Sequence, residues 1–211
     1  MFNISPHLPE ILAAYSILVV GASSPGPSVA LLIGIATEQG RTPALMATLG
    51  IAIGSMTINI ITIFGVELIL LHAAWMMTYL RIIGALYLSY LAYGAFKKSI
   101  NPPAVESISV RKRSYGKLFL KGYLLQITNP KTISFWLAIA SVGAVEGAST
   151  GVVILFVLGA LVISFSGHAI WVVVLSVNRM RQAYARFRRQ IEFVLGSFLA
   201  FAAYRLGTSD S

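Results

Sequence analysis

The sequence predicts an all-α integral membrane protein whose six transmembrane helices form two inverted three-helix repeats, with helices 1 and 4 broken. Three observations favour this fold class: the composition is strongly apolar, the apolar residues gather in long runs, and proline interrupts two of these runs. The 211 residues are 57% hydrophobic and 11% charged. Soluble domains carry about 25% charged residues, so this composition is typical of a chain surrounded by lipid.

Six apolar runs are candidates for membrane-spanning helices. A helix needs about 20 apolar residues to cross a hydrocarbon core of about 30 Å. The runs lack the alternation of polar and apolar residues that marks strands, which favours helices. The predicted spans cover about residues 10–37, 43–70, 74–96, 118–145, 151–176 and 191–207, and the last is the shortest.

The residue types present exclude several kinds of chemistry. The chain has no cysteine, so disulfides, thiolate redox reactions and cysteine-bound metals are ruled out. Phosphate-binding loops, the H-E-x-x-H pattern and clusters of carboxylates are also missing, so we expect no ATP-driven step, no metal and no cofactor. The first ten residues contain no lysine or arginine. We therefore expect the first run to be a retained span rather than a cleaved signal peptide.

The basic residues predict how the spans are oriented. Lysine and arginine are enriched in the short cytoplasmic loops of membrane proteins. Thirteen of the 16 basic residues fall between spans 1 and 2, 3 and 4, or 5 and 6, which predicts cytoplasmic loops there and both termini outside. They are Arg41, Lys97, Lys98, Arg111, Lys112, Arg113, Lys117, Lys121, Arg179, Arg181, Arg186, Arg188 and Arg189. Anionic membrane lipids account for the net charge of +9, so no nucleic-acid partner is expected.

A polar loop divides the chain into two halves of three spans each. Residues 100–114, INPPAVESISVRKRS, combine prolines with charges. Because three is odd, equivalent halves lie upside down relative to each other, as in many secondary transporters. We predict one transmembrane transporter domain over 1–211, with repeat 1 at about 10–96, a basic loop at about 97–117 and repeat 2 at about 118–207.

Proline breaks the first span of each half at a similar depth. The first break is SPGPS at residues 24–28, and the second is QITNPK at residues 126–131. Proline inside a helix costs about 3 kcal/mol, because it removes an N–H donor and clashes with the preceding turn. At 1.5 Å per residue, Pro27 lies roughly 15 Å and Pro130 roughly 18 Å from the cytoplasmic ends of their spans. Both breaks are therefore predicted near the membrane midplane.

The broken helices predict a binding site for a small charged molecule. Free helix N-termini attract a carboxylate, and the carbonyls at helix C-termini attract an ammonium group. Lys131 adds a positive charge whose insertion costs roughly 2.5–3.5 kcal/mol at the centre of a membrane helix, which argues for a role. The alternative is that the prolines only bend the helices for packing. The candidate binding residues are Pro25, Gly26, Pro27, Ser28, Gln126, Asn129, Pro130 and Lys131.

Four further polar residues are candidates for coupling or gating. Glu38 forms either a gate pair with Arg41 or part of a solvated turn. Glu67 lies near the outer end of span 2 and is the candidate for an acidic proton carrier, which needs burial to raise its pKa. His168 titrates in a useful range, although its small neighbours also suit close helix packing. Asn59 either lines the cavity or bonds across helices.

Most of the chain resembles a known family of transporters. The stretch "SPGPSVALLIGIATEQGRTPALMATLGIAIG" looks like the N-terminal signature of the LysE/RhtB amino-acid exporters, and "FLKGYLLQITNPKTISFWLAIA" is similar to the second signature of that family. The stretch "RIIGALYLSYLAYGAFKKS" resembles its third span. The resemblance covers residues 10 to 207 with the spacing intact, and the two breaks in their contexts carry most of its weight.

The resemblance implies export driven by the proton-motive force across the bacterial inner membrane. The expected partners are an amino acid or related small metabolite, protons and lipids, and the termini would then be periplasmic. Many relatives place an acidic residue after the span-2 glycine, whereas here Ser55 follows Gly54. If that acid carries protons or binds a cationic substrate in the relatives, this protein does so differently or not at all, and Ser55 is a further candidate for coupling or gating.

Two other functions remain open at the level of the sequence. A passive channel would use the same spans without a gradient. An intramembrane serine protease is suggested by Gly21-Ala-Ser-Ser24, with His168 as the base, since a serine nucleophile needs a base in hydrogen-bond reach. Neither the substrate nor the oligomeric state follows from the sequence, although helix faces rich in glycine, alanine and serine are suited to a homodimer.

Overall fold

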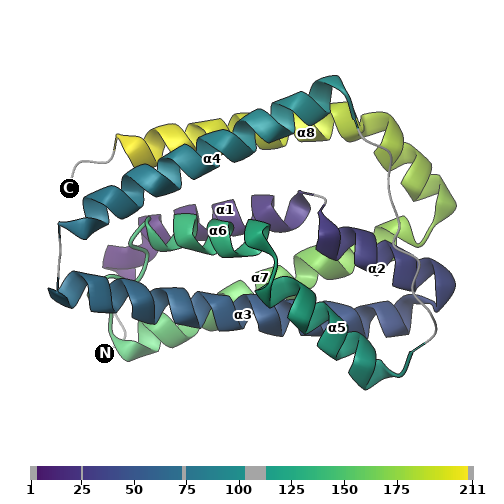
Figure 1. The fold of residues 1–211 in the computed structure, drawn as a ribbon, viewed down its shortest axis with the longest axis horizontal. Coiled ribbons are helices and arrows are strands. Elements are labelled where there is room, and N and C mark those ends of the chain that lie inside the picture. Colours follow the sequence, from purple (N-terminus) through teal and green to yellow (C-terminus); the bar gives the residue numbers. More distant parts are fainter. Residues whose placement is uncertain (1–3, 25, 73–74, 103–112, 209–211) are drawn as a thin grey trace.

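The computed structural model describes residues 4–24, 26–72, 75–102 and 113–208, and within these ranges it contains helices and no strand (Figure 1). A short 3₁₀ turn, η1 (Ser5–His7), precedes eight α-helices. They are α1 (Leu8–Ser23), α2 (Pro27–Glu38), α3 (Arg41–His72), α4 (Met76–Ile100), α5 (Tyr115–Ile127), α6 (Pro130–Ala140), α7 (Thr150–Leu175) and α8 (Asn178–Gly207).

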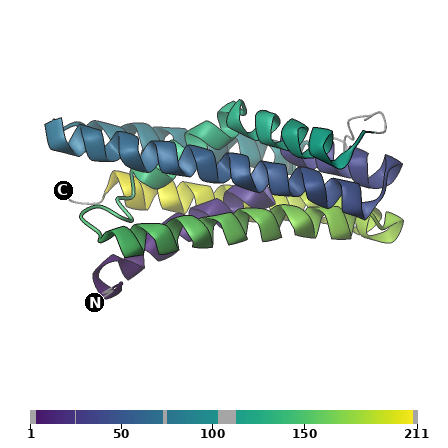
Figure 2. The same ribbon diagram turned by 90° about the horizontal axis from the view of Figure 1, so that it is seen from below.

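The helices form an elongated bundle whose long axis they all roughly follow (Figures 1 and 2). Both ends of the chain lie at one end of this bundle, together with the turn between α6 and α7. The turns between α2 and α3 and between α7 and α8 lie at the other end, where α4 ends and α5 begins. The structure therefore gathers the basic connections at one end of the bundle, which we call the basic end.

Only some of the predicted spans are single helices that are long and apolar enough to cross a membrane. Among the described residues, Arg41–Leu68 and Thr150–Leu175 are long and apolar enough to cross a membrane. The pair Ser5–Ser23 and Pro27–Glu38 passes as one span bent by 51°. The broken first helix is thus confirmed, and α5 and α6 are likewise separate helices where a broken fourth span was predicted.

Two predicted boundaries are wrong. Residues 178–190, expected as a loop, belong to α8, because helical hydrogen bonding continues through this polar stretch where α8 leaves the apolar part of the bundle. The fourth span, expected to reach residue 145, ends at Ala140. Gly143 and Gly147, with φ of 74° and 66°, then turn the chain in conformations that favour glycine.

Local steric rules explain both helix breaks. Ser24 and Gly26 each precede a proline, and a residue before proline is pushed out of the helical region. Ser24 is extended, with φ −83° and ψ 116°, and Gly26 is extended with φ −153° and ψ −165°. Asn129 precedes Pro130 and is also extended, with φ −77° and ψ 112°. Pro27 and Pro130 then occupy the first position of α2 and α6, where a missing N–H costs nothing.

Glycines let α3 and α5 cross in close contact. A Cβ atom added at Gly50 of α3 would collide with the carbonyl oxygen of Phe119 in α5. In the same way, a Cβ atom at Gly122 of α5 would collide with the carbonyl oxygen of Ala47 in α3. Small residues bring backbones together in membrane helices, where dispersion contacts replace the hydrophobic effect. The second broken span is thereby fixed against α3.

A dense apolar cluster closes the basic end of the bundle. Its members come from α2, α3, α5 and α7, and all are almost completely buried. They are Leu31, Leu32, Ile35, Ala36, Ala44, Ala47, Ile51, Leu118 and Val172. We call this group the basic-end cluster. Because protein cores pack at crystal-like density, the cluster leaves little room for a solute to pass on this side.

Candidate functional site

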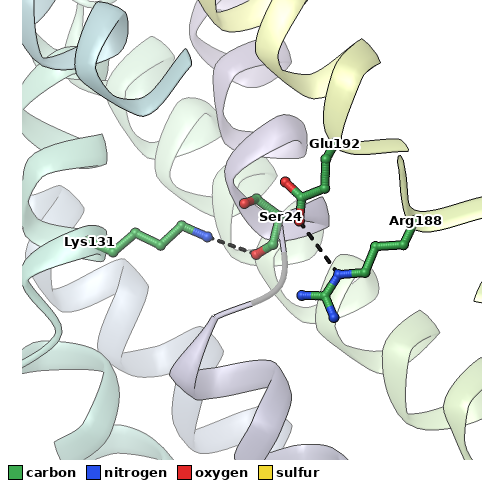
Figure 3. Close-up of polar contacts among 4 residues, drawn as sticks. All are labelled: Ser24, Lys131, Arg188 and Glu192. Carbon is green, nitrogen blue, oxygen red and sulfur yellow. Dashed lines mark hydrogen bonds and ion pairs between the residues drawn. The ribbon is translucent and has the colours of Figure 1, made fainter. Parts of the chain in front are cut away.

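The two helix breaks meet in the centre of the bundle. The Nζ atom of Lys131, at the start of α6, donates to the carbonyl oxygen of Ser24 at 2.7 Å and to that of Gly21 at 3.4 Å (Figure 3). Both carbonyls belong to the C-terminal end of α1, where the helix dipole is negative. Lys131 lies at the second break and therefore binds the backbone of the first break, which is more than a hundred residues earlier in the sequence.

A second hydrogen bond joins the other halves of the broken spans. Ser28 Oγ, in the first turn of α2, donates to Gln126 Oε1 of α5 at 2.9 Å, and both side chains are buried. Gln126 approaches closely because Gly54 of α3 has no side chain: a Cβ atom there would lie 3.0 Å from Gln126 Cβ. Predicted binding residues from the two helix breaks thus contact each other directly.

Two helix N-termini face this central region. The first helical hydrogen bond of α2 runs from the amide of Ala30 to the carbonyl of Gly26, so the amides of Ser28 and Val29 precede the bonded turn. At α6 the Asn129 side chain accepts from the amide of Lys131 at 3.0 Å. Asparagine is among the preferred residues at this capping position. Amide donors and positive dipole ends make the region suitable for an anionic group.

A small cavity of about 40 Å³ lies between the breaks. It is large enough for a few water molecules, since one water needs roughly 10–15 Å³ on this measure. Its walls combine amide, hydroxyl and basic groups with apolar and aromatic surface. They are Leu18, Gly21, Ala22, Ser24, Gly26, Ser28, Val29, Ser55, Gln126, Asn129, Lys131, Thr132, Phe135, Trp136, Ser164 and His168.

The structure places most predicted binding residues on this cavity. Gly26, Ser28, Gln126, Asn129 and Lys131 line it. The two prolines are exposed and start helices without lining the cavity, so they shape the site rather than bind in it. Pro25, the remaining candidate, lies outside the described residues.

Two of the coupling candidates also line the central cavity. His168 of α7 is buried, and its Nδ1 atom lies 2.8 Å from the carbonyl oxygen of Ser164, one turn earlier. Ser55 of α3 is buried, and its Oγ atom accepts a 3.0 Å hydrogen bond from Trp136 Nε1. Both residues are therefore part of the site.

The other coupling candidates lie elsewhere. Glu38 is exposed at the basic end, where Arg41 Nε donates to Ser176 Oγ of another helix at 2.8 Å. Glu67 is exposed and lines a second, open cavity; its role as an acidic proton carrier stays a prediction. Asn59 is 1% exposed and faces that same cavity, and its Nδ2 atom has no hydrogen-bond partner in the described structure.

This second cavity, which we call the outer cavity, has a volume of about 360 Å³. It lies between α3, α6 and α7 at the end of the bundle away from the basic end. Asn59, Glu67 and Glu146 contribute polar groups, and Trp136 contributes to the walls of both cavities. The indole ring of Trp136 is only 2% exposed. Trp136 therefore borders both the central cavity and the outer cavity.

Sequence reasoning missed a buried charged group beside the site. Glu192 of α8 is completely buried, and its Oε1 atom lies 3.9 Å from Arg188 Nε, one turn earlier. Figure 3 shows this pair, together with Lys131, around the backbone at Ser24. A carboxylate in the sixth apolar run was visible as an intramembrane ionisable residue. It was not among the predicted site residues, because it stands alone at the start of the sixth span, away from both breaks.

Among the residues described, no group of three or more histidines and carboxylates is arranged to hold a metal ion. The site offers hydrogen-bond donors, carbonyls and basic groups to a small polar molecule. In the same helix as His168, Ser166 Oγ donates to the carbonyl oxygen of Val162 at 2.7 Å.

Comparisons with known proteins identify the family. Residues 19–210 match the family described as LysE type translocator. The chain belongs to the LysE type translocator family. It is 30% identical over 189 residues to the threonine efflux protein of Escherichia coli (strain K12), covering 86% of this chain and 89% of that relative. It is also 30% identical over 190 residues to the threonine efflux protein of Salmonella typhi, with the same shares of both chains.

Another relative, matched over a shorter stretch, is also named for efflux. A putative amino acid efflux protein of Bacillus subtilis (strain 168) is 32% identical over 131 residues, 62% of either chain. No solved structure matches this translocator. The predicted membership of the LysE/RhtB exporters is confirmed, and the chain is a membrane translocator of multiple apolar helices. Because the relatives are named for efflux, they support transport over the intramembrane protease that the sequence left open.

Proposed function

We propose that this translocator exports small neutral amino acids, threonine among them, across the bacterial inner membrane in exchange for protons. The observation that carries the proposal is the contact between the two breaks, where Lys131 binds the carbonyls of Ser24 and Gly21. Here amide donors, a cation and helix-end carbonyls lie around one cavity. A zwitterion needs these groups for its carboxylate and its ammonium.

The lining of the central cavity supports a neutral substrate. Its ionisable side chains are Lys131 and His168, so the substrate carboxylate has a cation beside it. The hydroxyls of Ser28 and Ser55 and the amides of Gln126 and Asn129 can hydrogen-bond a polar side chain such as that of threonine. The threonine efflux relatives support the same choice.

Six transmembrane helices in two inverted repeats remain our proposal for the architecture. The packing pattern supports it. The first broken span, α1 with α2, contacts α7, and the second, α5 with α6, contacts α3. In the proposed repeats α3 and α7 are equivalent helices. Likewise, α4 contacts α6 and α8 contacts α1. We place the basic end in the cytoplasm and both termini in the periplasm, as the distribution of lysine and arginine predicts.

Alternating access is the transport mechanism that fits this arrangement best. The basic-end cluster closes the site on the proposed cytoplasmic side. On the other side Trp136 borders both the central cavity and the outer cavity, and we take its indole ring as the second barrier. Rocking of one repeat against the other would open the first barrier and close the second. Proton coupling belongs to the proposal because the family resemblance implies it.

Substitution of Lys131 tests the proposed site. We expect Lys131→Ala and Pro27→Ala to lose threonine export while still reaching the membrane, because the first removes the cation and the second removes the proline that begins α2. The measurement is uptake of labelled threonine by inside-out membrane vesicles energised with a proton gradient. Removal of the ammonium from its carbonyls is expected to lower the initial rate about tenfold or more, since charge-assisted hydrogen bonds contribute about 1.5–3 kcal/mol.

The matched control is Lys117→Ala, which removes an exposed lysine from α5 at the basic end. It should transport at the wild-type rate. Normal export by Lys131→Ala would remove the proposed site. Threonine flux that persists after the gradient is collapsed, in either direction, would favour the passive channel.

A further inference from the structure

One buried carboxylate has no role in the substrate site described above. Glu192 is 0% exposed, and neither of its carboxylate oxygens has a hydrogen-bond partner in the described structure. A buried ionised carboxylate is costly unless it is paired and hydrogen-bonded. Glu192 must therefore either bind a proton or draw a cation closer than the 3.9 Å that separates it from Arg188 Nε.

The groups around Glu192 are basic and come from several helices. Its carboxylate interacts electrostatically with Lys98 of α4, Lys131 of α6 and Arg188 of α8. Tyr184 lies two turns before Glu192 on α8, with the Arg188 guanidinium 5.8 Å from its ring centre. On α7, His168 interacts electrostatically with Lys131. The one acid thus shares its surroundings with three permanent or titratable cations.

Aromatic contacts connect this cluster to the first helix break. The ring of Tyr184 stacks edge-on against Trp171 of α7, with centres 5.1 Å apart. Trp171 Nε1 in turn donates to the carbonyl oxygen of Ala22 at 2.9 Å. In Figure 3, Lys131 and Glu192 flank the backbone of Ser24. Glu192 thus lies on one side of the backbone whose carbonyl Lys131 binds from the other.

We infer that Glu192 is the proton-binding residue of this exporter and that it controls which cation occupies the carbonyls of Gly21 and Ser24. This inference rests on the proposed function. With a neutral Glu192, the Lys131 ammonium stays on those carbonyls, as in the structure, and takes the place of a substrate ammonium. When Glu192 loses its proton, the carboxylate attracts Lys131 and frees the carbonyls for the substrate. Proton and substrate then exclude each other, which is the requirement for exchange.

The test compares two modes of transport in proteoliposomes. Threonine/threonine exchange needs no gradient, whereas accumulation of threonine needs proton exchange. In the wild type, competition between proton and substrate raises the KM of threonine exchange about tenfold per pH unit on the acid side of the titration. Glu192→Gln keeps the neutral state at every pH. We expect its KM to be high and independent of pH, and its gradient-driven accumulation to be lost.

Three further variants sharpen this test. Glu192→Asp, which keeps the acid, should recover a pH-dependent KM. Glu67→Gln, at the carboxylate that the sequence had favoured, should keep the wild-type profile. Glu106→Gln, in the connection between α4 and α5, is the matched control for loss of a carboxylate.

Each outcome decides the inference. A wild-type pH profile in Glu192→Gln would overturn it, as would a flat profile in Glu67→Gln alone. Loss of exchange in both Glu192→Gln and Glu192→Asp at normal membrane levels would make Glu192 a structural residue. Wild-type export that needs no proton gradient would overturn the coupling and leave amino-acid export standing. A wild type that moves no amino acid would instead overturn the proposed function, and this inference with it.

Discussion

Lys131 joins the two helix breaks through a single side chain. Its ammonium binds the C-terminal carbonyls of α1 at 2.7 and 3.4 Å, where the substrate ammonium was expected to bind. The ring centre of Phe135 lies 5.7 Å from Lys131 Nζ, a distance typical of a cation–π contact. The lysine therefore provides donors for the free carbonyls of the break, and under the proposed function a substrate ammonium competes with it.

Trp136 provides a prediction at the same scale. Because Trp136 borders both the central cavity and the outer cavity, Trp136→Ala should join them and let threonine leak down its gradient without a proton gradient. Ser55→Ala removes the acceptor of the 3.0 Å bond from Trp136 Nε1. Loss of one such hydrogen bond costs about 0.5–1.5 kcal/mol, so a smaller leak is expected.

Efflux of preloaded threonine from de-energised proteoliposomes measures this leak. Trp136→Phe keeps the bulk of the ring without the indole donor, and it should resemble Ser55→Ala. If Trp136→Ala leaks no faster than the wild type, the indole ring is not the outer barrier.

At the scale of helices, the crossing of α3 and α5 depends on the absence of side chains. Gly50 and Gly122 each face a backbone carbonyl of the opposite helix. This contact fixes α5, and with it Gln126, next to α2. The geometry of the site therefore depends on two glycines that do not line the central cavity.

Gly50→Ala is expected to destabilise the protein, because the added Cβ atom collides with backbone rather than with a movable side chain. Overpacking of this kind costs typically about 1–3 kcal/mol. Gly65→Ala, in the same helix but with open space around it, should be neutral or stabilising by up to about 1 kcal/mol. Thermal unfolding of the two detergent-purified variants gives the comparison, and equal melting temperatures would contradict close α3–α5 packing.

On the scale of the whole molecule, both ends of the chain lie at the end of the bundle opposite the basic connections (Figures 1 and 2). This arrangement needs an even number of crossings, which six spans provide. The outer cavity opens at the same end as the termini. Orientation in the membrane therefore decides whether that cavity faces the periplasm, as an exporter needs for release.

The lack of cysteine makes orientation directly measurable. A single cysteine at Ser5, beside α1, should react in intact cells with a maleimide that cannot cross the inner membrane, after the outer membrane has been permeabilised. A single cysteine at Ser114, beside α5, should react only after the inner membrane is also opened. The reverse pattern would place the basic end outside the cell and contradict the proposed orientation of the protein in the membrane.

The sequence determined the parts of this protein that depend on neighbouring residues. Proline and the residues before it break α1 from α2 and α5 from α6, because steric clashes within two or three residues decide the backbone there. It also determined that Lys131, Gln126 and Ser28 lie at breaks, and the composition alone excluded thiol chemistry. These inferences need no knowledge of which helix packs against which.

The tertiary structure alone decided which groups meet. Glu192 lies beside a break more than 160 residues earlier, and Trp136 reaches Ser55 across 81 residues. Such pairs depend on the register and rotation of packed helices, to which every contact in the bundle contributes. Glu67 and Glu192 are both acids near the ends of apolar runs, and only the rotation of α3 and α8 leaves the first exposed and buries the second.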